Sequence, residues 1–214
     1  MEALSVIENK NVKWGRALLH FGLYVTLVAI YYFANLDERS ALGVYAMAGI
    51  VIVGLDVLRF SSLSWKAFVN DTLASWNIIK DDELEKVSGL SIGVVGMAFV
   101  MCGMDKMTTI FAALCVASID PAARIGGKLW GRDRIFGNKT LQGTLCGIVV
   151  GLITVMVGYA ILGAKWGMPH VFAIVCAAFA ELMVKEFDNF AIPLVAAGAL
   201  KLATLSTLTY YGGV

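Results

Sequence analysis

Seven apolar runs follow one another along the chain, and polar or charged stretches separate them. A transmembrane helix needs about 20 consecutive, mostly apolar residues, and each run is close to that length. The pattern therefore predicts an all-α, polytopic membrane bundle of about seven transmembrane helices. The runs cover residues 17–34, 41–60, 87–104, 107–125, 143–163, 169–186 and 190–211.

The segment between the second and third runs, residues 61–86, has a different pattern. Its large apolar side chains recur every three or four residues with polar residues between them: Trp65, Phe68, Val69, Trp76 and Ile79. This period predicts an amphipathic helix that lies in the cytoplasmic membrane interface. Such a helix can be a simple surface connector, or it can act as a movable cover or lateral gate for a lipid substrate.

Composition supports the membrane assignment and narrows the classes of function. Of the 214 residues, 59% are hydrophobic and only 15% are charged, whereas about a quarter of the residues in a soluble domain are charged. Soluble enzymes, disordered chains and nucleic-acid-binding proteins are therefore poor fits. No linker or internal repeat divides residues 1–214, so we expect a single integral membrane domain.

The N-terminus and the cysteines add two smaller expectations. The first fourteen residues are polar and lack the layout of a signal peptide, so the first apolar run is expected to remain as a membrane anchor. Cys102, Cys115, Cys146 and Cys176 stand singly within apolar runs. Because they lack the spacing of a zinc motif, we expect neither a disulfide nor a metal cluster.

The distribution of positive charge predicts the orientation. With seven spans, alternate loops share a side; three of the seventeen Lys and Arg residues fall on one side, Lys201 falls in the last span, and the other side holds the rest. Positive residues accumulate in cytoplasmic loops, so we expect the N-terminus inside and the C-terminus outside. The cytoplasmic set is Lys10, Lys13, Arg16, Arg59, Lys66, Lys80, Lys86, Arg124, Lys128, Arg132, Arg134, Lys139 and Lys185.

The segment from Ala117 to Gly143 is the most informative for chemistry. Asp120 follows a largely apolar run, and because a carboxylate there costs about 3 kcal/mol to insert, it is expected to face an interior cavity. Pro121 comes next, and proline suits the first turn of a helix. We therefore expect a helix break with Asp120 as the cap of a new helix. Such a break exposes backbone groups that can meet ions or phosphates.

The loop expected after that break is rich in glycine and in cations. Glycine permits close backbone approach, and clustered Lys and Arg neutralise phosphate oxygens. One acid beside several cations is typical of phosphoryl transfer, although a basic cytoplasmic loop without function would show the same cations. Residues 137–140, Gly-Asn-Lys-Thr, look like the end of a P-loop, but an asparagine separates the glycine from the lysine, so no Walker site is expected.

Further charged and polar residues fall at the same predicted end of the bundle. Each pair alone is more typical of a structural salt bridge, but their convergence on one end indicates a functional site. They are Arg16 with His20 on the first span, Asp56 with Arg59 on the second, Glu85 with Ser88 before the third, and Glu181, Lys185 and Asp188 on one face of the sixth, followed by Asn189 and Pro193.

In this order, the motifs resemble the CTP-dependent lipid kinases, which comprise dolichol (polyprenol) kinase, the yeast-type diacylglycerol kinase and phytol kinase and are distantly related to phosphatidate cytidylyltransferase. The longest match is an Asp-x-x-Ala, Gly-Lys-x-x-Gly, Asn-Lys-Thr-x-x-Gly pattern. The matching residues are Arg16, His20, Asp56, Arg59, Glu85, Ser88, Gly89, Asp120, Ala123, Gly127, Lys128, Gly131, Asn138, Lys139, Thr140, Gly143, Glu181, Asp188, Asn189 and Pro193.

The resemblance implies transfer of the terminal phosphoryl group of CTP to the hydroxyl of a membrane lipid alcohol, with Mg²⁺ or another divalent cation. Polyprenol or dolichol is the favoured acceptor, with diacylglycerol and phytol as alternatives. The implied partners are CTP, the lipid alcohol and membrane lipids, without nucleic acid, and a homodimer is compatible with so small a kinase. The protein would be a multi-pass protein of the cell or endoplasmic-reticulum membrane, with its active site on the cytoplasmic face.

The resemblance also implies roles for residues. Asp120 and Asp188 would hold the metal ion. The catalytic residues would be Asp120, Arg16 and Lys139, with Arg16 reaching the lipid hydroxyl or a phosphate. The nucleotide would be bound by Gly127, Lys128, Gly131, Asn138, Lys139, Thr140, Gly143, Glu181 and Asn189.

Two other functions remain open from the sequence. A phosphatidate cytidylyltransferase-like CDP-lipid synthase would use the same nucleotide but release pyrophosphate, and the chain lacks the Lys-Asp and His-Gly-Gly pattern of that enzyme. A small ion-coupled transporter would also bury acids at a broken helix. Transporter sites, however, lie near the middle of the membrane, whereas the motifs here crowd one face.

Overall fold

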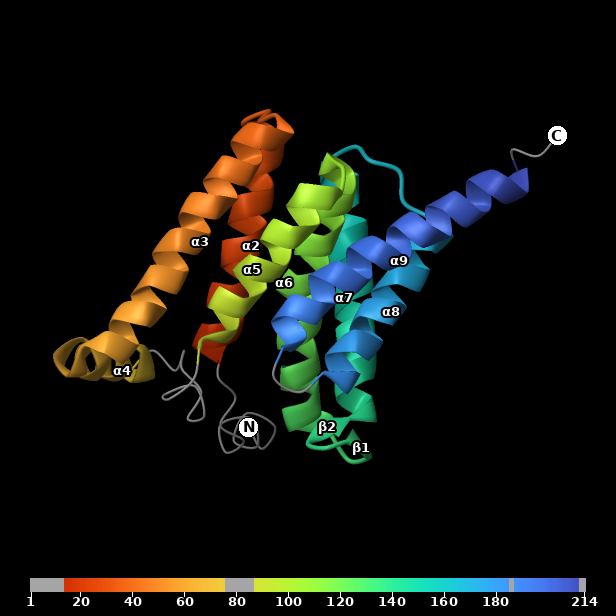
Figure 1. The fold of residues 1–214 in the computed structure, drawn as a ribbon. Coiled ribbons are helices and arrows are strands. Elements are labelled where there is room, and N and C mark those ends of the chain that lie inside the picture. Colours follow the sequence, from red (N-terminus) through yellow and green to blue (C-terminus); the bar gives the residue numbers. More distant parts are fainter. Residues whose placement is uncertain (1–13, 76–86, 185–186, 212–214) are drawn as a thin grey trace.

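The computed structural model describes residues 14–75, 87–184 and 187–211. Helices account for almost all of the regular structure in these ranges, and one two-stranded antiparallel hairpin interrupts them (Figure 1). The elements are α2 (Trp14–Phe33), α3 (Glu38–Ser61), α4 (Leu63–Ser75), α5 (Gly89–Gly103), α6 (Lys106–Trp130), β1 (Arg134–Phe136), β2 (Lys139–Thr140), α7 (Leu141–Ile161), α8 (Met168–Met183) and α9 (Asp188–Tyr211).

Five of these helices are long and apolar enough to cross a membrane: α2, α3, α6, α7 and α9. The other two apolar helices, α5 and α8, have 15 and 16 residues. Each of the seven coincides with one of the predicted runs, so the all-α polytopic bundle is confirmed. All four cysteines lie within the described ranges and are free thiols there.

Helix α6 is the centre of the bundle. It packs against α2, α5, α7, α8 and α9, and 83% of its most apolar window is buried, against 17–33% for the other long spans. Small side chains such as Ala113 and Ala117 leave room for these neighbours. In Figure 1, α6 stands between α2 and α7, while α3 lies at the margin with α4 across its lower end. Residues on α6 are therefore in reach of most other helices.

Helices α6 and α7 approach each other closely through glycines. A Cβ atom on Gly143 would lie 2.6 Å from the carbonyl oxygen of Ala123, and one on Gly126 would collide with the Cβ of Cys146. Close backbone approach at small residues is the usual way in which helices associate in lipid. These contacts fix α7, and the hairpin that precedes it, against the last turns of α6.

The expected helix break at Asp120 is wrong. Helix α6 runs without interruption from Lys106 to Trp130 with Pro121 inside it, so Asp120 is a mid-helix residue and caps nothing. A proline removes one backbone hydrogen bond and crowds the preceding turn, but a helix packed on several sides tolerates this within a membrane. The nearby Ser118 hydroxyl bonds to the Leu114 carbonyl at 2.7 Å.

Continuation of α6 also corrects the expected loop. Arg124, Gly126, Gly127 and Lys128 belong to the last two turns of the helix rather than to a flexible segment. The chain then passes through Gly131 into the hairpin, where β1 pairs with β2. Gly137 turns the hairpin with a φ of 57°, a conformation that glycine adopts without strain.

The predicted helix in this segment is present as α4, which begins just after α3 ends at Ser61; its place in the membrane interface stays a prediction. The rings of Trp65 and Phe68 lie 5.5 Å apart on α4. Trp76 and Ile79, which belong to the same predicted stripe, lie outside the described residues, as does Glu85. Whether α4 covers or gates a lipid site stays a prediction.

Asp188 and Asn189 do not belong to the sixth span, which is a second correction. Helix α8 ends at Met183, and Asp188 opens α9. The Asp188 carboxylate accepts a hydrogen bond from the backbone N–H of Asn189 at 2.9 Å, and a negative charge is favourable in the first turn of a helix. Lys185, predicted on the same face, lies outside the described residues.

At the opposite end of the bundle, Asp105 caps α6. Its carboxylate accepts from the Thr108 backbone N–H at 3.0 Å and from the Thr108 hydroxyl at 2.8 Å, and the Lys201 ammonium lies 3.4 Å away. Partial burial raises the pKa of this carboxyl, but the Thr108 hydrogen bonds and Lys201 outweigh burial and hold the pKa below its usual value. The carboxylate therefore stabilises the fold in its ionised form.

We predict that Asp105→Ala lowers the free energy of unfolding by about 1 kcal/mol, because α6 loses its N-cap. Since the folded pKa is depressed, the contribution of Asp105 is complete above about pH 4 and is lost as the pH falls further. Thermal unfolding in detergent at pH 7 and at pH 3 checks both points. If Asp105→Ala lowers stability as much at pH 3 as at pH 7, Asp105 does not stabilise α6 through its ionised carboxylate.

Candidate active site

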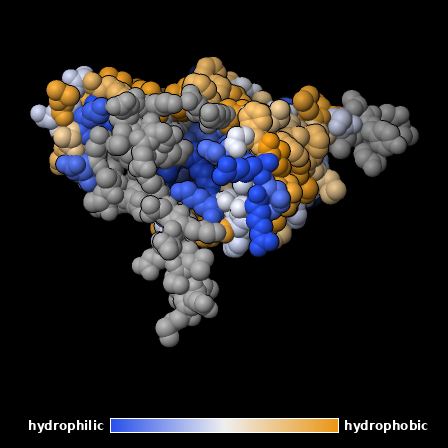
Figure 2. Space-filling view, turned by 90° about the horizontal axis from the view of Figure 1, so that it is seen from below, coloured by the Kyte–Doolittle hydropathy of each residue, from blue (hydrophilic) through white to orange (hydrophobic). Residues whose placement is uncertain are grey.

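A cavity of about 350 Å³ opens at the end of the bundle that carries α4 and the hairpin. Viewed from that end, hydrophilic side chains surround a hollow, and hydrophobic surface lies beyond them (Figure 2). Six elements contribute to the wall. The lining residues are Arg16, Ala17, His20, Asp120, Pro121, Ala123, Arg124, Ile125, Gly127, Lys128, Asn138, Lys139, Thr140, Gly143, Thr144, Glu181 and Asp188.

Three carboxylates meet in this cavity. Asp120 comes from α6, Glu181 from the last turns of α8 and Asp188 from the first turn of α9. One ligand oxygen from each lies within 4.8 Å of those of the others, and all three residues are buried. We call these residues the acid triad. Buried acids of like charge repel one another unless cations or a metal ion neutralise them.

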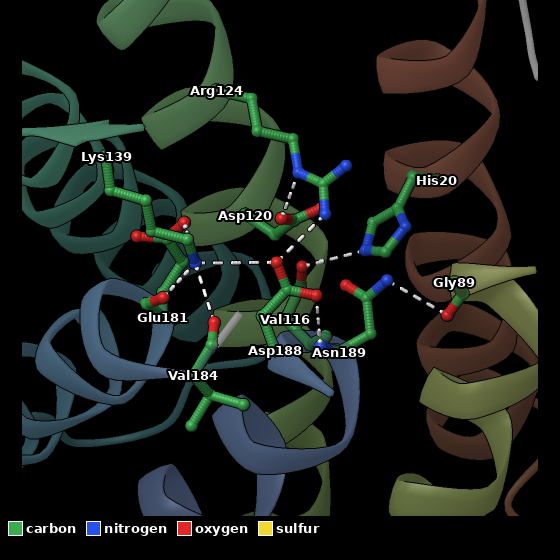
Figure 3. Close-up of polar contacts among 10 residues, drawn as sticks. All are labelled: His20, Gly89, Val116, Asp120, Arg124, Lys139, Glu181, Val184, Asp188 and Asn189. Carbon is green, nitrogen blue, oxygen red and sulfur yellow. Dashed lines mark hydrogen bonds and ion pairs between the residues drawn. The ribbon is translucent and has the colours of Figure 1, made fainter. Parts of the chain in front are cut away.

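Arg124 neutralises two members of the triad. One turn after Asp120 on α6, its Nε atom donates to Asp120 Oδ1 at 2.5 Å, and Nη2 donates to Asp188 Oδ2 at 3.0 Å. In Figure 3 the guanidinium lies beside both carboxylates and contacts each of them. The side chain is 23% exposed, so it forms part of the cavity wall.

Lys139 neutralises the third member. Its Nζ atom lies 2.8 Å from Glu181 Oε1 and 3.6 Å from Asp188 Oδ2. The same ammonium donates to the backbone carbonyls of Glu181 and Val184, the latter at 3.0 Å, where α8 ends and its carbonyls lack helical partners. The hairpin thus directs Lys139 into the acid triad, as Figure 3 shows.

The opposite wall of the cavity comes from α2. Arg16, Ala17 and His20 line it. The buried His20 ring binds the Val116 carbonyl through Nε2 at 3.1 Å, and because a carbonyl only accepts, Nε2 carries the proton. This contact joins α2 to α6 one turn before Asp120.

Glycines and the N-cap of α7 form the wall next to the hairpin. Gly127 and Gly143 line the cavity, and a Cβ on either would lie 3.1 Å from Thr140 Oγ1. Thr140 caps α7 by accepting from the Gly143 N–H at 3.2 Å. These glycines therefore permit the close packing of α6, β2 and α7 as well as access to the cavity.

A second polar group lies between α3, α5 and α9. Asp56 pairs with Arg59 at 3.2 Å and accepts from the Ser88 N–H at 2.8 Å, which fixes the start of α5. The next residue, Gly89, accepts at its carbonyl from the amide of Asn189 at 2.9 Å. Asn189 thus ties the first turn of α9, and with it Asp188, to α5.

Most of the site residues predicted from the sequence meet at the cavity. Gly131 and Asn189 are the exceptions, since neither is among its lining residues. The sequence analysis named His20 among the converging polar residues but gave it no role, counted Arg124 only among the cations, and did not single out Thr144. Arg124 stands four residues after Asp120, the spacing at which acidic and basic side chains pair along a helix, but the expected break at Pro121 concealed that signal.

The acid triad fits a hard divalent cation. Mg²⁺ prefers oxygen ligands and is commonly bound through one or two carboxylates together with substrate phosphates, and the triad offers three carboxylates within 4.8 Å. The basic side chains of Lys139, Lys128 and Arg16 lie around the same cavity. The structure thus defines a cavity at one end of a helical bundle in which acidic and basic side chains meet.

A comparison with known proteins gives one relative of known activity. The chain is 27% identical over 149 residues to CTP-dependent diacylglycerol kinase 1 of Eremothecium gossypii. The match covers 67% of this chain but only 45% of the length of that protein. This similarity confirms the predicted resemblance to the CTP-dependent lipid kinases. No family model and no solved structure matches the chain.

Proposed function

We propose that this protein transfers the terminal phosphoryl group of CTP to the hydroxyl of a membrane lipid alcohol. The observation that carries this proposal is the buried acid triad, Asp120, Glu181 and Asp188, facing Lys139 in a cavity at one end of a membrane bundle. Phosphoryl transfer needs a cation site beside positive groups, with little covalent chemistry from the protein. The choice of CTP as donor rests on the relative.

In this mechanism, Asp120 and Asp188 would hold Mg²⁺, and Glu181 would add a third negative charge beside it. The bound ion supplies neutralisation of the charge that develops on the transferred phosphoryl group. The ammonium of Lys139, already among these acids at 2.8 Å from Glu181 Oε1, is placed to bind a phosphate oxygen. Lys128 and Arg16 add positive charge at the rim, and the small residues Gly127 and Gly143 leave space for the triphosphate.

The lipid hydroxyl approaches from the α2 wall. Its oxygen attacks the terminal phosphorus of CTP, the bond to the β-phosphate oxygen breaks, and CDP leaves while the hydroxyl proton passes to a base. Arg16 would orient the incoming oxygen or a phosphate. Asp120 lies one turn after Val116, the α6 residue that His20 of α2 contacts, and it is the carboxylate we assign as the base. Diacylglycerol is the first acceptor to test, because the relative is a diacylglycerol kinase; polyprenol, dolichol and phytol follow.

The site faces the cytoplasm in this proposal. The cavity opens at the end where the predicted cytoplasmic Lys and Arg residues gather, among them Arg16, Lys128 and Lys139, and positive residues favour that side. CTP is a cytoplasmic nucleotide, so the same orientation gives the cavity access to its donor.

Product analysis tests the proposal. Purified protein in lipid nanodiscs is incubated with Mg²⁺, CTP labelled in the γ-phosphate, and each lipid alcohol in turn. We expect label in a lipid monophosphate, with CDP as the second product and ATP a poorer donor. Release of pyrophosphate and formation of a CDP-lipid would support the cytidylyltransferase instead. Ion uptake into liposomes that depends on Asp120, without nucleotide turnover, would support the transporter.

A further inference from the structure

Arg124 occupies the oxygens that a metal ion needs. The contacts of Arg124 with Asp120 Oδ1 and Asp188 Oδ2 use two of the three carboxylates that lie within 4.8 Å of one another. Figure 3 shows the guanidinium and both carboxylates meeting at this point. A divalent cation held by Asp120 and Asp188 would therefore stand against the guanidinium.

The charges make joint occupancy unfavourable. Three carboxylates face two basic side chains, Arg124 and Lys139, which leaves a formal charge of −1. Adding a divalent cation would change this to +1 and would place it within a few ångströms of a guanidinium, where repulsion is strong at low dielectric. We therefore expect one of the two basic side chains to withdraw when the ion binds.

The geometry shows which one can withdraw. Lys139 is held by Glu181 Oε1 at 2.8 Å and by two carbonyls at the end of α8. If Lys139 withdrew, these carbonyls would lose their hydrogen-bond donor. Arg124 contacts Asp120 and Asp188, the two carboxylates assigned to the ion, so its guanidinium stands in the place that the ion would take. Its side chain lines the cavity and is partly exposed.

We propose that Arg124 is a built-in counter-ion that competes with the divalent cation. Without the ion, its guanidinium holds Asp120 and Asp188 together; when the ion binds, the guanidinium leaves these carboxylates and binds phosphate oxygens of the nucleotide. The planar guanidinium offers paired donors that match phosphate geometry. This inference rests on the proposed function, because it assumes that the acid triad is the cation site.

Direct metal binding tests the inference without turnover. Binding of Mn²⁺ is measured by electron paramagnetic resonance on the purified protein in detergent, for the wild type, Arg124→Ala and Arg124→Lys. Loss of the competing charge should tighten Mn²⁺ binding by about tenfold in Arg124→Ala. Arg124→Lys, which keeps the charge but makes fewer contacts, should fall between this variant and the wild type. Lys66→Ala, on α4 outside the cavity, is the matched control for loss of a positive charge and should leave the affinity unchanged.

A second measurement separates competition from a purely structural salt bridge. Arg124→Ala should raise the KM for CTP by about tenfold while it tightens Mn²⁺ binding, because the guanidinium no longer reaches the phosphates. If the contacts of Arg124 are only a structural salt bridge, Arg124→Ala would lower thermal stability without tightening the binding of Mn²⁺. If Arg124→Ala does not yield folded protein, Arg124→Lys decides alone, and an affinity equal to that of the wild type overturns the inference.

The outcomes also distinguish this inference from the proposed function. Unchanged or weaker Mn²⁺ binding in Arg124→Ala, with phosphoryl transfer intact in the wild type, overturns the inference alone. A wild-type protein without saturable Mn²⁺ binding overturns the cation site, and the inference with it.

Discussion

Asp120→Asn is expected to lower the rate of phosphoryl transfer by about a thousandfold, the range seen when a single preorganised electrostatic contact is removed from an active site. Asparagine has the shape of aspartate but no charge. The acid triad would lose one of the two carboxylates assigned to the cation, and Arg124 would lose its contact with Asp120 Oδ1. Folding should survive, because Asp120 caps no helix and the other packing of α6 is unchanged.

Single-turnover transfer from labelled CTP, measured at saturating Mg²⁺, gives the size of this effect. Asp37→Asn is the matched control, since Asp37 is an exposed residue before α3 at the opposite end of the bundle. The control should keep the wild-type rate. Activity of Asp120→Asn within a few-fold of that control would remove Asp120 from the cation site.

Lys139→Met is expected to abolish transfer and also to destabilise the protein. Methionine keeps much of the length and apolar character of the lysine stem but lacks the ammonium. Glu181, which is only 5% exposed, would become a buried carboxylate without its close cation. Removing one partner of a buried ion pair costs about 3 kcal/mol or more. The carbonyls of Glu181 and Val184 would lose a donor at the end of α8 as well.

A double variant separates the two effects of Lys139. In Lys139→Met combined with Glu181→Gln, the buried side chain is neutral, so most of the lost stability should return while transfer stays absent. Thermal unfolding in detergent measures stability, and Lys165→Met, in the exposed loop after α7, serves as the control. If the double variant is no more stable than Lys139→Met, the ion pair with Glu181 is not the source of the loss.

The helices of this fold were predictable because the bilayer imposes a simple length rule on apolar runs. Each predicted span corresponds to one observed helix, and the amphipathic stripe with Trp65 and Phe68 correctly predicted α4. Helix ends were less predictable. Pro121 indicated a helix boundary by the usual rule for isolated helices, but α6 continues because its neighbours hold it on several sides.

The composition of the site was predictable to a greater extent than its geometry. Asp120, Glu181 and Asp188 were all candidates from their place at one end of the apolar runs, but only the packing of α6, α8 and α9 brings their oxygens within 4.8 Å. Asp188 was assigned to the sixth span because Lys185 and Asp188 follow Glu181 at helical spacing, whereas α8 ends at Met183 and α9 begins at Asp188. Periodicity alone does not locate such a helix end.

The hairpin explains how a short, glycine-containing segment became part of the site. The sequence indicated that Gly137 and Lys139 were not a P-loop, which agrees with the observed turn. It did not indicate that β1 and β2 pair or that this pairing sends Lys139 toward α8. The pairing of two such short strands depends on a single turn. The direction of the Lys139 side chain therefore could not be predicted from the sequence.

The position of a bound cation tests the central claim most directly. A structure of the protein with Mn²⁺ and a non-hydrolysable CTP analogue, with the ion located by its anomalous scattering, should place the ion between Asp120 and Asp188 with a phosphate oxygen of the nucleotide as a further ligand. An ion or a triphosphate bound away from these two carboxylates, or at the end of the bundle that holds Asp105, would contradict the proposed kinase site.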